Sequence, residues 1–146
     1  MEIRKMMESD LEEVCQIERN TFSDPWSEED FKGVLRDKKN DYLVVVIEKQ
    51  VVGYCGYWGV AGEGDIYNVA VKEENRGQKI GYHMLCELIR IAKSRGITSL
   101  TLEVRSSNES AIRLYCSLGF EQTALRKDFY TKPKEDAVIM WLHDIQ

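Results

Sequence analysis

The sequence has few prolines, no long apolar run and no closely spaced cysteines, and each absence excludes a class of protein. Only two prolines occur in 146 residues. No low-complexity stretch or internal repeat marks a linker, so we expect one domain over residues 1–146. The longest apolar run, residues 43–47, is far too short to span a bilayer. The first residues lack the apolar segment of a signal peptide. We therefore expect a cytoplasmic protein with no membrane partner.

The spacing of the cysteines and the net charge indicate which ligands and partners to expect. The four cysteines, Cys15, Cys55, Cys86 and Cys116, are far apart in sequence and form no C-x-x-C pair. This spacing argues against a zinc site or a redox pair, and we expect four reduced thiols in the core and no metal. The net charge of −5 lacks the basic excess of a nucleic-acid binder. We expect no direct nucleic-acid partner, while a basic ligand or peptide is compatible with this charge.

Four segments carry helix signals. Ser9 and Glu12 form a capping-box pattern that predicts a helix to about residue 20, and Ser27 with Asp30 predicts a second helix. Residues 80–95 carry the clearest apolar stripe, and a glycine follows where that helix should end. A fourth helix is expected from Asn108 to the glycine at position 119.

Runs rich in β-branched and aromatic residues predict the strands. Their expected ranges are 42–48, 51–58, 65–71, 99–104, 120–126 and 137–143. A turn is expected at residues 49–50 and a loop at residues 59–64. The helix between the third and fourth strands is a crossover, which makes those two strands parallel. The sequence thus predicts an α/β fold with a mixed central sheet flanked by helices.

The first segment that carries chemistry joins the third strand to the helix after it. A helix N-terminus leaves N–H groups free and carries a partial positive charge, and glycine lets an anion approach the backbone. Such a turn is a candidate cradle for a pyrophosphate, although a basic helix cap without a ligand would look the same. The candidate cofactor-binding residues here are Val69, Ala70, Val71, Arg76, Gly77, Gln78, Lys79, Ile80, Gly81 and Tyr82.

The second segment follows the strand that ends in Leu-Glu-Val at residues 102–104. It reads Asn108-x-x-Ala111-x-x-x-Tyr115-x-x-x-Gly119-Phe120. Each residue has an ordinary structural interpretation: Asn108 as a helix cap, Tyr115 as a core aromatic and Gly119 as a helix stop. The order and spacing of the two segments together are more specific than either one alone.

Together, the two segments resemble the signature of the GNAT superfamily of acyl-CoA N-acyltransferases, and the resemblance covers nearly the whole chain. It implies the GNAT fold, acetyl-CoA as co-substrate and transfer of an acetyl group to an amine. One departure is Lys79, which stands where the signature usually has its central glycine. We expect Lys79 to keep a helical backbone, since a first-turn residue does not need a positive φ, and its side chain could reach a phosphate.

Further runs are similar to the bacterial ribosomal-protein-alanine N-acetyltransferases, a narrower family within this superfamily. They are Asp-Pro-Trp-Ser-Glu at 24–28, Asn-Val-Ala-Val at 68–71, Leu-Glu-Val-Arg-Ser-Ser-Asn at 102–108, Glu-Asp-Ala at 135–137 and Ile-Met at 139–140. This likeness implies that the acceptor is the N-terminal alanine of a small-subunit ribosomal protein. The implied partner is that protein's N-terminal peptide.

The resemblance also implies roles for single residues. Glu103 matches the family's proton acceptor and Tyr115 its proton donor, which are the groups that acetyl transfer to an amine requires. Asn108 and the backbone near Val69 and Val71 are implied to hold the cofactor, with no covalent enzyme intermediate. Trp26, Tyr67 and Tyr130 are candidate walls of a peptide groove, but they are equally compatible with packing or surface positions.

Two other functions remain open from the sequence. A GNAT enzyme could act on another amine, such as a lysine side chain, a polyamine or an antibiotic, although the narrower likeness argues against this. A non-catalytic acetyl-CoA-binding module would be expected to lack the base or the acid, whereas Glu103 and Tyr115 are both present.

Overall fold

A mixed β-sheet organises the computed structural model, which describes residues 1–145. Within these residues the sheet has seven strands in the spatial order β1-β2-β3-β4-β5-β7-β6. All neighbouring strands are antiparallel except β4 and β5, which are parallel. The strands are β1 (Glu2–Lys5), β2 (Asn40–Ile47), β3 (Gln50–Val60), β4 (Glu63–Val71), β5 (Ser99–Arg105), β6 (Glu121–Thr131) and β7 (Lys134–Leu142). The predicted fold class and the parallel pair are confirmed.

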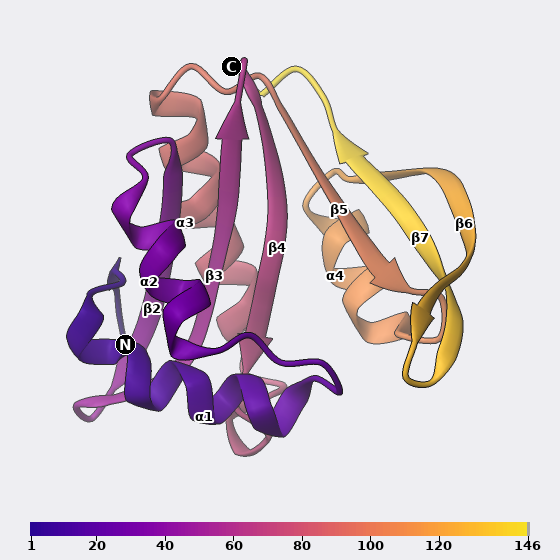
Figure 1. Ribbon diagram of the computed structural model, residues 1–146. Helices are drawn as coiled ribbons and strands as arrows, with labels where there is room; N and C mark the ends of the chain where they lie inside the picture. Colours follow the sequence, from indigo (N-terminus) through magenta and orange to yellow (C-terminus); the bar gives the residue numbers. More distant parts are fainter. Residues whose placement is uncertain (146) are drawn as a thin grey trace.

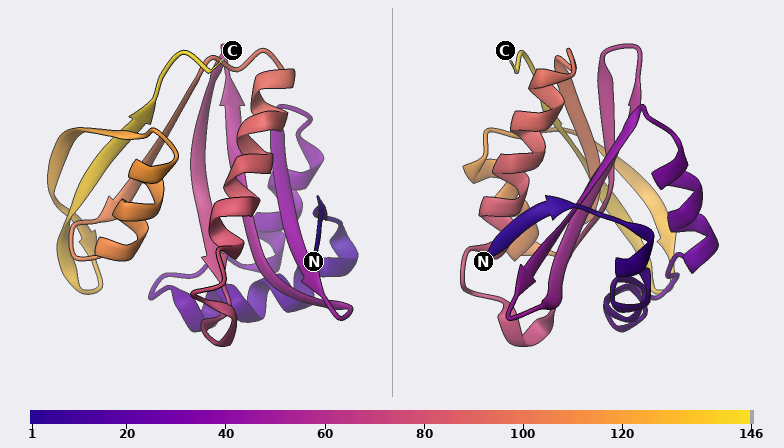
Figure 2. Two further views of the ribbon diagram at one scale, coloured as in Figure 1. Left: turned by 180° about the vertical axis from the view of Figure 1, so that it is seen from behind. Right: turned by 90° about the vertical axis from the view of Figure 1, so that its left-hand side faces the viewer.

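Helices cover the two faces of this sheet (Figures 1 and 2). The first two pack on one face of β2 to β4, and the third lies behind the same strands, while the fourth lies behind β5 and β7. None of the helices between residues 1 and 145 is long and apolar enough to cross a membrane. The helices are α1 (Leu11–Thr21), α2 (Glu28–Arg36), α3 (Ile80–Ser94) and α4 (Glu109–Ser117), with short 3-10 turns at Glu8–Asp10 and Glu73–Asn75.

The helix starts follow from local hydrogen bonds, and one of them corrects the sequence prediction. At α2 the expected capping box is present: the Asp30 N–H donates to Ser27 Oγ at 3.2 Å, and the Ser27 N–H donates to Asp30 Oδ2 at 2.9 Å. The expected box from Ser9 to Glu12 is wrong. Ser9 lies inside the 3-10 turn, and the Met7 N–H donates instead to Asp10 Oδ2 at 2.8 Å.

Strand β1, which the sequence analysis missed, explains this shift. It brings Arg4 to Asp10, and the guanidinium binds both carboxylate oxygens at 2.8 Å. Asp10 is buried in this position, and its carboxylate fixes the start of the helical segment at Met7, two residues before Ser9. A four-residue strand with one strongly apolar residue has little signal of its own, and it forms through its pairing with β2.

Two other expectations about the outline of the sheet are also corrected. The loop predicted at 59–64 is a tight turn, because β3 extends to Val60 and β4 begins at Glu63. Strand β6 continues to Thr131, five residues beyond its predicted end. All four cysteines are free, but Cys86 and Cys116 are exposed on the polar faces of their helices, so only the other two are core thiols.

Candidate active site

The parallel strands β4 and β5 diverge, and the candidate site lies where they separate. They pair only over four residues each, from Glu63↔Ser99 to Ile66↔Leu102. At the end of this pairing β4 has a bulge: Ile66 and Asn68 pair with consecutive residues of β3, which leaves Tyr67 as the extra residue. A bulge bends its strand and ends regular pairing. Figure 1 shows the two strands together at the top and apart at the bottom.

A cavity of about 1210 Å³ occupies this opening and reaches both faces of the sheet. Its lining comes from the ends of β4 and β5, from α3 and α4 behind them, and from the connection between α1 and α2 in front. Every sequence-predicted site residue except Gln78, which is exposed, lines it. These residues are Val69, Ala70, Val71, Arg76, Gly77, Lys79, Ile80, Gly81, Tyr82, Glu103, Asn108 and Tyr115.

At one end of the cavity is the N-terminus of α3. No side chain caps this helix, so its first-turn N–H groups remain available to a ligand. Gly77 has φ +81°, and an added Cβ there would meet no atom within 4 Å. The Arg76 side chain is held against the end of β4, because its Nε donates to the Val71 carbonyl at 3.0 Å. This combination of free amides, open space and nearby cations fits a phosphate group.

Lys79 departs from the helical backbone that we expected. It is the N-cap residue of α3, with φ 62° and ψ 20°, which is the left-handed region. Glycine adopts this conformation without strain, whereas lysine rarely does, so the turn into α3 holds Lys79 in a backbone conformation that its side chain disfavours. Gly81 matters for another reason: a Cβ there would lie 3.2 Å from Leu114 Cδ2, so glycine keeps α3 close to α4.

The two candidate proton-transfer groups enter the cavity from different elements. Glu103 projects from β5 on the face opposite its buried neighbours, and its Oε1 lies 3.9 Å from Arg126 Nη1. Tyr115 projects from α4 and is 7% exposed, with its ring 5.9 Å from that of Phe120. Burial raises the pKa of Tyr115 well above the usual value for tyrosine. Its phenol therefore keeps its proton at neutral pH.

Aromatic side chains form a wall beside Glu103. Tyr67 is 52% exposed, and its ring lies 4.6 Å from that of Trp58 and 6.3 Å from that of Trp26. Tyr130 also lines the cavity, and burial raises its pKa to about 12. The three aromatic residues named from the sequence thus all line the cavity, whereas Trp58, which was not named, supports Tyr67 from behind.

Sequence reasoning missed a buried carboxylate, Glu18. It is 2% exposed; its Oε1 accepts from the Tyr54 hydroxyl at 2.5 Å and its Oε2 from the Trp26 N–H at 3.0 Å. Glu18 therefore anchors the segment between α1 and α2 over the cavity. A signal was present: Glu18 lies seven residues after Leu11, on the apolar stripe of α1, where a carboxylate is unexpected.

Across residues 1–145, no group of three or more His, Cys, Asp or Glu side chains is arranged to hold a metal ion.

Comparisons with known proteins identify the family. Residues 11–120 match the model of the Acetyltransferase (GNAT) family. The chain is 34% identical over 136 residues to the ribosomal protein bS18-alanine N-acetyltransferase of Salmonella typhimurium, covering 92% of this chain and 91% of that protein. The corresponding Escherichia coli enzyme is 33% identical over 142 residues, covering 96% and 95%.

Solved structures agree with this likeness. The crystal structure of the Escherichia coli bS18-alanine N-acetyltransferase superposes with a TM-score of 0.89 at 32% identity, covering 98% of this chain and 93% of that one. Ard1 from Thermoplasma volcanium has a TM-score of 0.90 at 24% identity, which shows a shared fold. The chain belongs to the acetyltransferase (GNAT) family.

Proposed function

We propose that this enzyme transfers the acetyl group of acetyl-CoA to the N-terminal α-amino group of a protein, and that the acceptor is the N-terminal alanine of a small-subunit ribosomal protein. One observation carries the proposal: a carboxylate on β5 and a protonated phenol on α4 line the same cavity, where β4 and β5 separate. The proposed acceptor is supported by relatives that match over nearly the full length and are named ribosomal protein bS18-alanine N-acetyltransferases.

Acetyl-CoA would be held by backbone and side-chain groups along β4, α3 and α4. Beyond Ile66, β4 no longer pairs with β5, which leaves the Val69 backbone groups and the Val71 N–H for the pantetheine arm, while the Val71 carbonyl accepts from Arg76. The loop 76–82 would receive the pyrophosphate at the free amides of α3. Asn108 caps α4, with its Oδ1 accepting from the Ala111 N–H at 3.2 Å, and this keeps the start of α4 in place at the cavity.

The chemistry requires a neutral amine and a protonated leaving group. Glu103 would take a proton from the substrate ammonium, directly or through one water. The neutral amine nitrogen then bonds to the acetyl carbon as the carbon–sulfur bond breaks, and the second proton that it loses on becoming an amide would pass through water to restore the Tyr115 phenol. Tyr115 would protonate the departing thiolate, and its retained proton suits this role. Among the described residues that line the cavity there is no cysteine, which agrees with direct transfer of the acetyl group to the amine without an acetyl-cysteine intermediate.

The shape of the front rim supports a chain end as the acceptor. The segment between α1 and α2 is joined to the β6–β7 turn by a hydrogen bond from Ser23 Oγ to the Lys132 carbonyl. Ser23 lines the cavity together with Glu103, so this contact lies at the rim of the cavity. An N-terminus can enter at this rim end-on with chain on one side only, whereas a lysine in mid-chain has backbone on both sides that must stay outside the rim while its four-carbon stem reaches inward.

A matched set of peptides tests the proposal. The first begins with a free alanine and contains no lysine; the second has a blocked N-terminus and one internal lysine; the third replaces the first alanine with leucine. With purified protein and acetyl-CoA, mass spectrometry should show acetylation of the first peptide well above the other two. Faster acetylation of the lysine peptide would overturn the proposed acceptor.

A further inference from the structure

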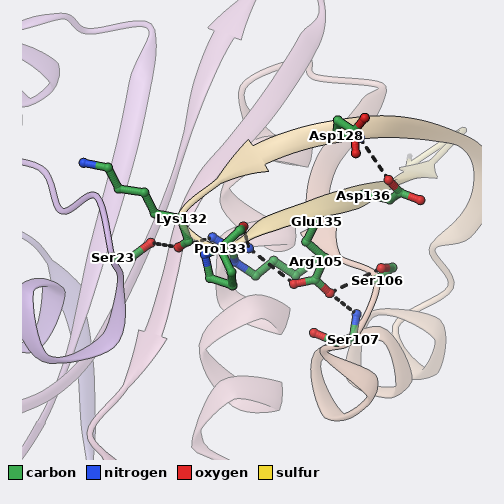
Figure 3. Close-up of polar contacts among 9 residues, drawn as sticks. All are labelled: Ser23, Arg105, Ser106, Ser107, Asp128, Lys132, Pro133, Glu135 and Asp136. Atoms are coloured by element: carbon green, nitrogen blue, oxygen red, sulfur yellow. Dashed lines mark hydrogen bonds and ion pairs between the residues drawn. The ribbon is translucent and has the colours of Figure 1, made fainter.

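Arg105 lies at the end of β5 and holds the turn between β6 and β7. Its Nη1 donates to the Pro133 carbonyl at 2.9 Å and lies 3.3 Å from Glu135 Oε1, while its Nη2 donates to the Lys132 carbonyl at 3.0 Å. The guanidinium carbon also lies 4.2 Å from the centre of the Tyr130 ring. One side chain thus contacts four residues of the hairpin, as Figure 3 shows for the polar contacts.

Glu135 extends this network to α4. Its Oε2 accepts from the Ser107 N–H at 2.7 Å and from the Ser106 hydroxyl at 3.3 Å (Figure 3). These hydrogen bonds lower the pKa of Glu135, so it stays ionised as the partner of Arg105. Residues 106 and 107 lead directly to Asn108, which caps α4. The hairpin is therefore fixed to the same turn that positions α4.

The network also reaches the opposite rim of the cavity. The Lys132 carbonyl, which accepts from Arg105, accepts at the same time from Ser23 Oγ at 2.5 Å. Ser23, Arg105 and Tyr130 all line the cavity, and Arg105 follows Glu103 by two residues on the same face of β5. The position of the Lys132 carbonyl, and with it the rim bridge, thus depends on Arg105.

We propose that Arg105 is a positioning residue that sets the β6–β7 hairpin as one wall of the peptide-binding part of the cavity, a role that rests on the proposed function. Arginine suits this role because its planar fork can bind two carbonyls and a carboxylate together while stacking on a ring. Lysine carries the same charge but cannot make that set of contacts.

Steady-state kinetics with the alanine-terminated peptide test the proposal in three variants. Arg105→Gln should raise the peptide KM about tenfold or more, since it removes several charge-assisted contacts, while the acetyl-CoA KM stays within about twofold. Arg105→Lys should be intermediate. The control is Arg90→Gln, which breaks an exposed ion pair with Glu87 on α3 and should leave both constants unchanged.

Hydrogen–deuterium exchange separates positioning from direct contact with substrate. In Arg105→Gln, amides of residues 128–136 should exchange faster without substrate, while those of α3 keep their protection and acetyl-CoA binds as in the wild type. A raised peptide KM with unchanged exchange would overturn positioning in favour of direct contact. Equal increases in the KM values of the peptide and of acetyl-CoA, with faster amide exchange throughout the protein, would overturn positioning in favour of general destabilisation.

The exchange readout does not depend on the substrate assignment. If the wild type acetylates none of the peptides, the proposed acceptor fails, and the role of Arg105 is then decided by exchange alone. Faster exchange confined to residues 128–136 would support the role, and unchanged exchange would overturn it.

Discussion

Replacing Lys79 with glycine separates the two properties that this residue brings to the cofactor loop, its backbone conformation and its charge. Lys79 has φ 62°, a left-handed conformation that costs a non-glycine residue about 1 kcal/mol. Glycine removes that strain, but it gives the unfolded chain more freedom, which costs about 0.5–1 kcal/mol. The two effects nearly cancel. We therefore expect the free energy of unfolding to change by less than about 1 kcal/mol, which corresponds to a Tm shift of no more than about 4 °C.

The charge effect should appear in binding. Lys79 is exposed at the cavity edge beside the free amides of α3, so its ammonium group is screened by solvent. An exposed ion pair contributes up to about 1 kcal/mol, which corresponds to about fivefold in affinity. Lys79→Gly should therefore raise the Kd of acetyl-CoA by about fivefold at low salt and by less at high salt.

Isothermal titration at two salt concentrations, with thermal unfolding alongside, measures both quantities. Two further variants are matched controls. Lys79→Asn tolerates the left-handed backbone without a charge and should bind like the glycine variant, whereas Lys79→Arg keeps the charge and should bind like the wild type. If Lys79→Gly binds acetyl-CoA as tightly as the wild type at low salt, the reasoning about the phosphate is refuted.

Three further predictions concern the acid, the base and the N-terminal ion pair. Tyr115→Phe should lower turnover by roughly 10²–10⁴ while acetyl-CoA binding persists; full activity in a peptide assay would make Tyr115 a packing residue. Glu103→Gln should be most defective near pH 7 and recover in part as pH rises past the α-amine pKa of about 8; a defect constant up to about pH 9.5 would contradict proton removal. The Arg4 guanidinium lowers the pKa of Asp10, so the stability that Asp10 contributes is present above its unfolded pKa of about 3.9 and is lost as pH falls through its folded pKa. Asp10→Asn should therefore lose less stability than the wild type between about pH 5 and pH 2 in urea titrations, and equal losses would count against this ion pair.

Structural features that depend on residues within a single helix could be predicted from the sequence. The apolar stripe of α3 and the capping box at Ser27 depend on residues three or four apart, so local spacing was enough. The candidate site residues were named largely through the resemblance to the GNAT superfamily, and the arrangement of β4 and β5 brings the signature loop and Tyr115 to one opening.

Features that depend on tertiary contacts could not be predicted in this way. Strand β1 depends on its pairing with β2, and the start of the helical segment at Met7 depends on Asp10, which Arg4 holds across a turn. The left-handed backbone of Lys79 is imposed by the turn into α3, against the ordinary preference of lysine. From the sequence alone, Arg105 has the pattern of a solvent-exposed strand residue. Its contacts come from a hairpin 27 residues later in the chain.

The most direct test of the acceptor is mass spectrometry of protein N-termini from cells with and without this enzyme. We expect the N-terminal alanine of a small-subunit ribosomal protein to be acetylated in the first case and free in the second, and we expect reintroduction of the wild type to restore acetylation. Equal acetylation of that alanine in both cells, with a loss at lysine side chains instead, would contradict it.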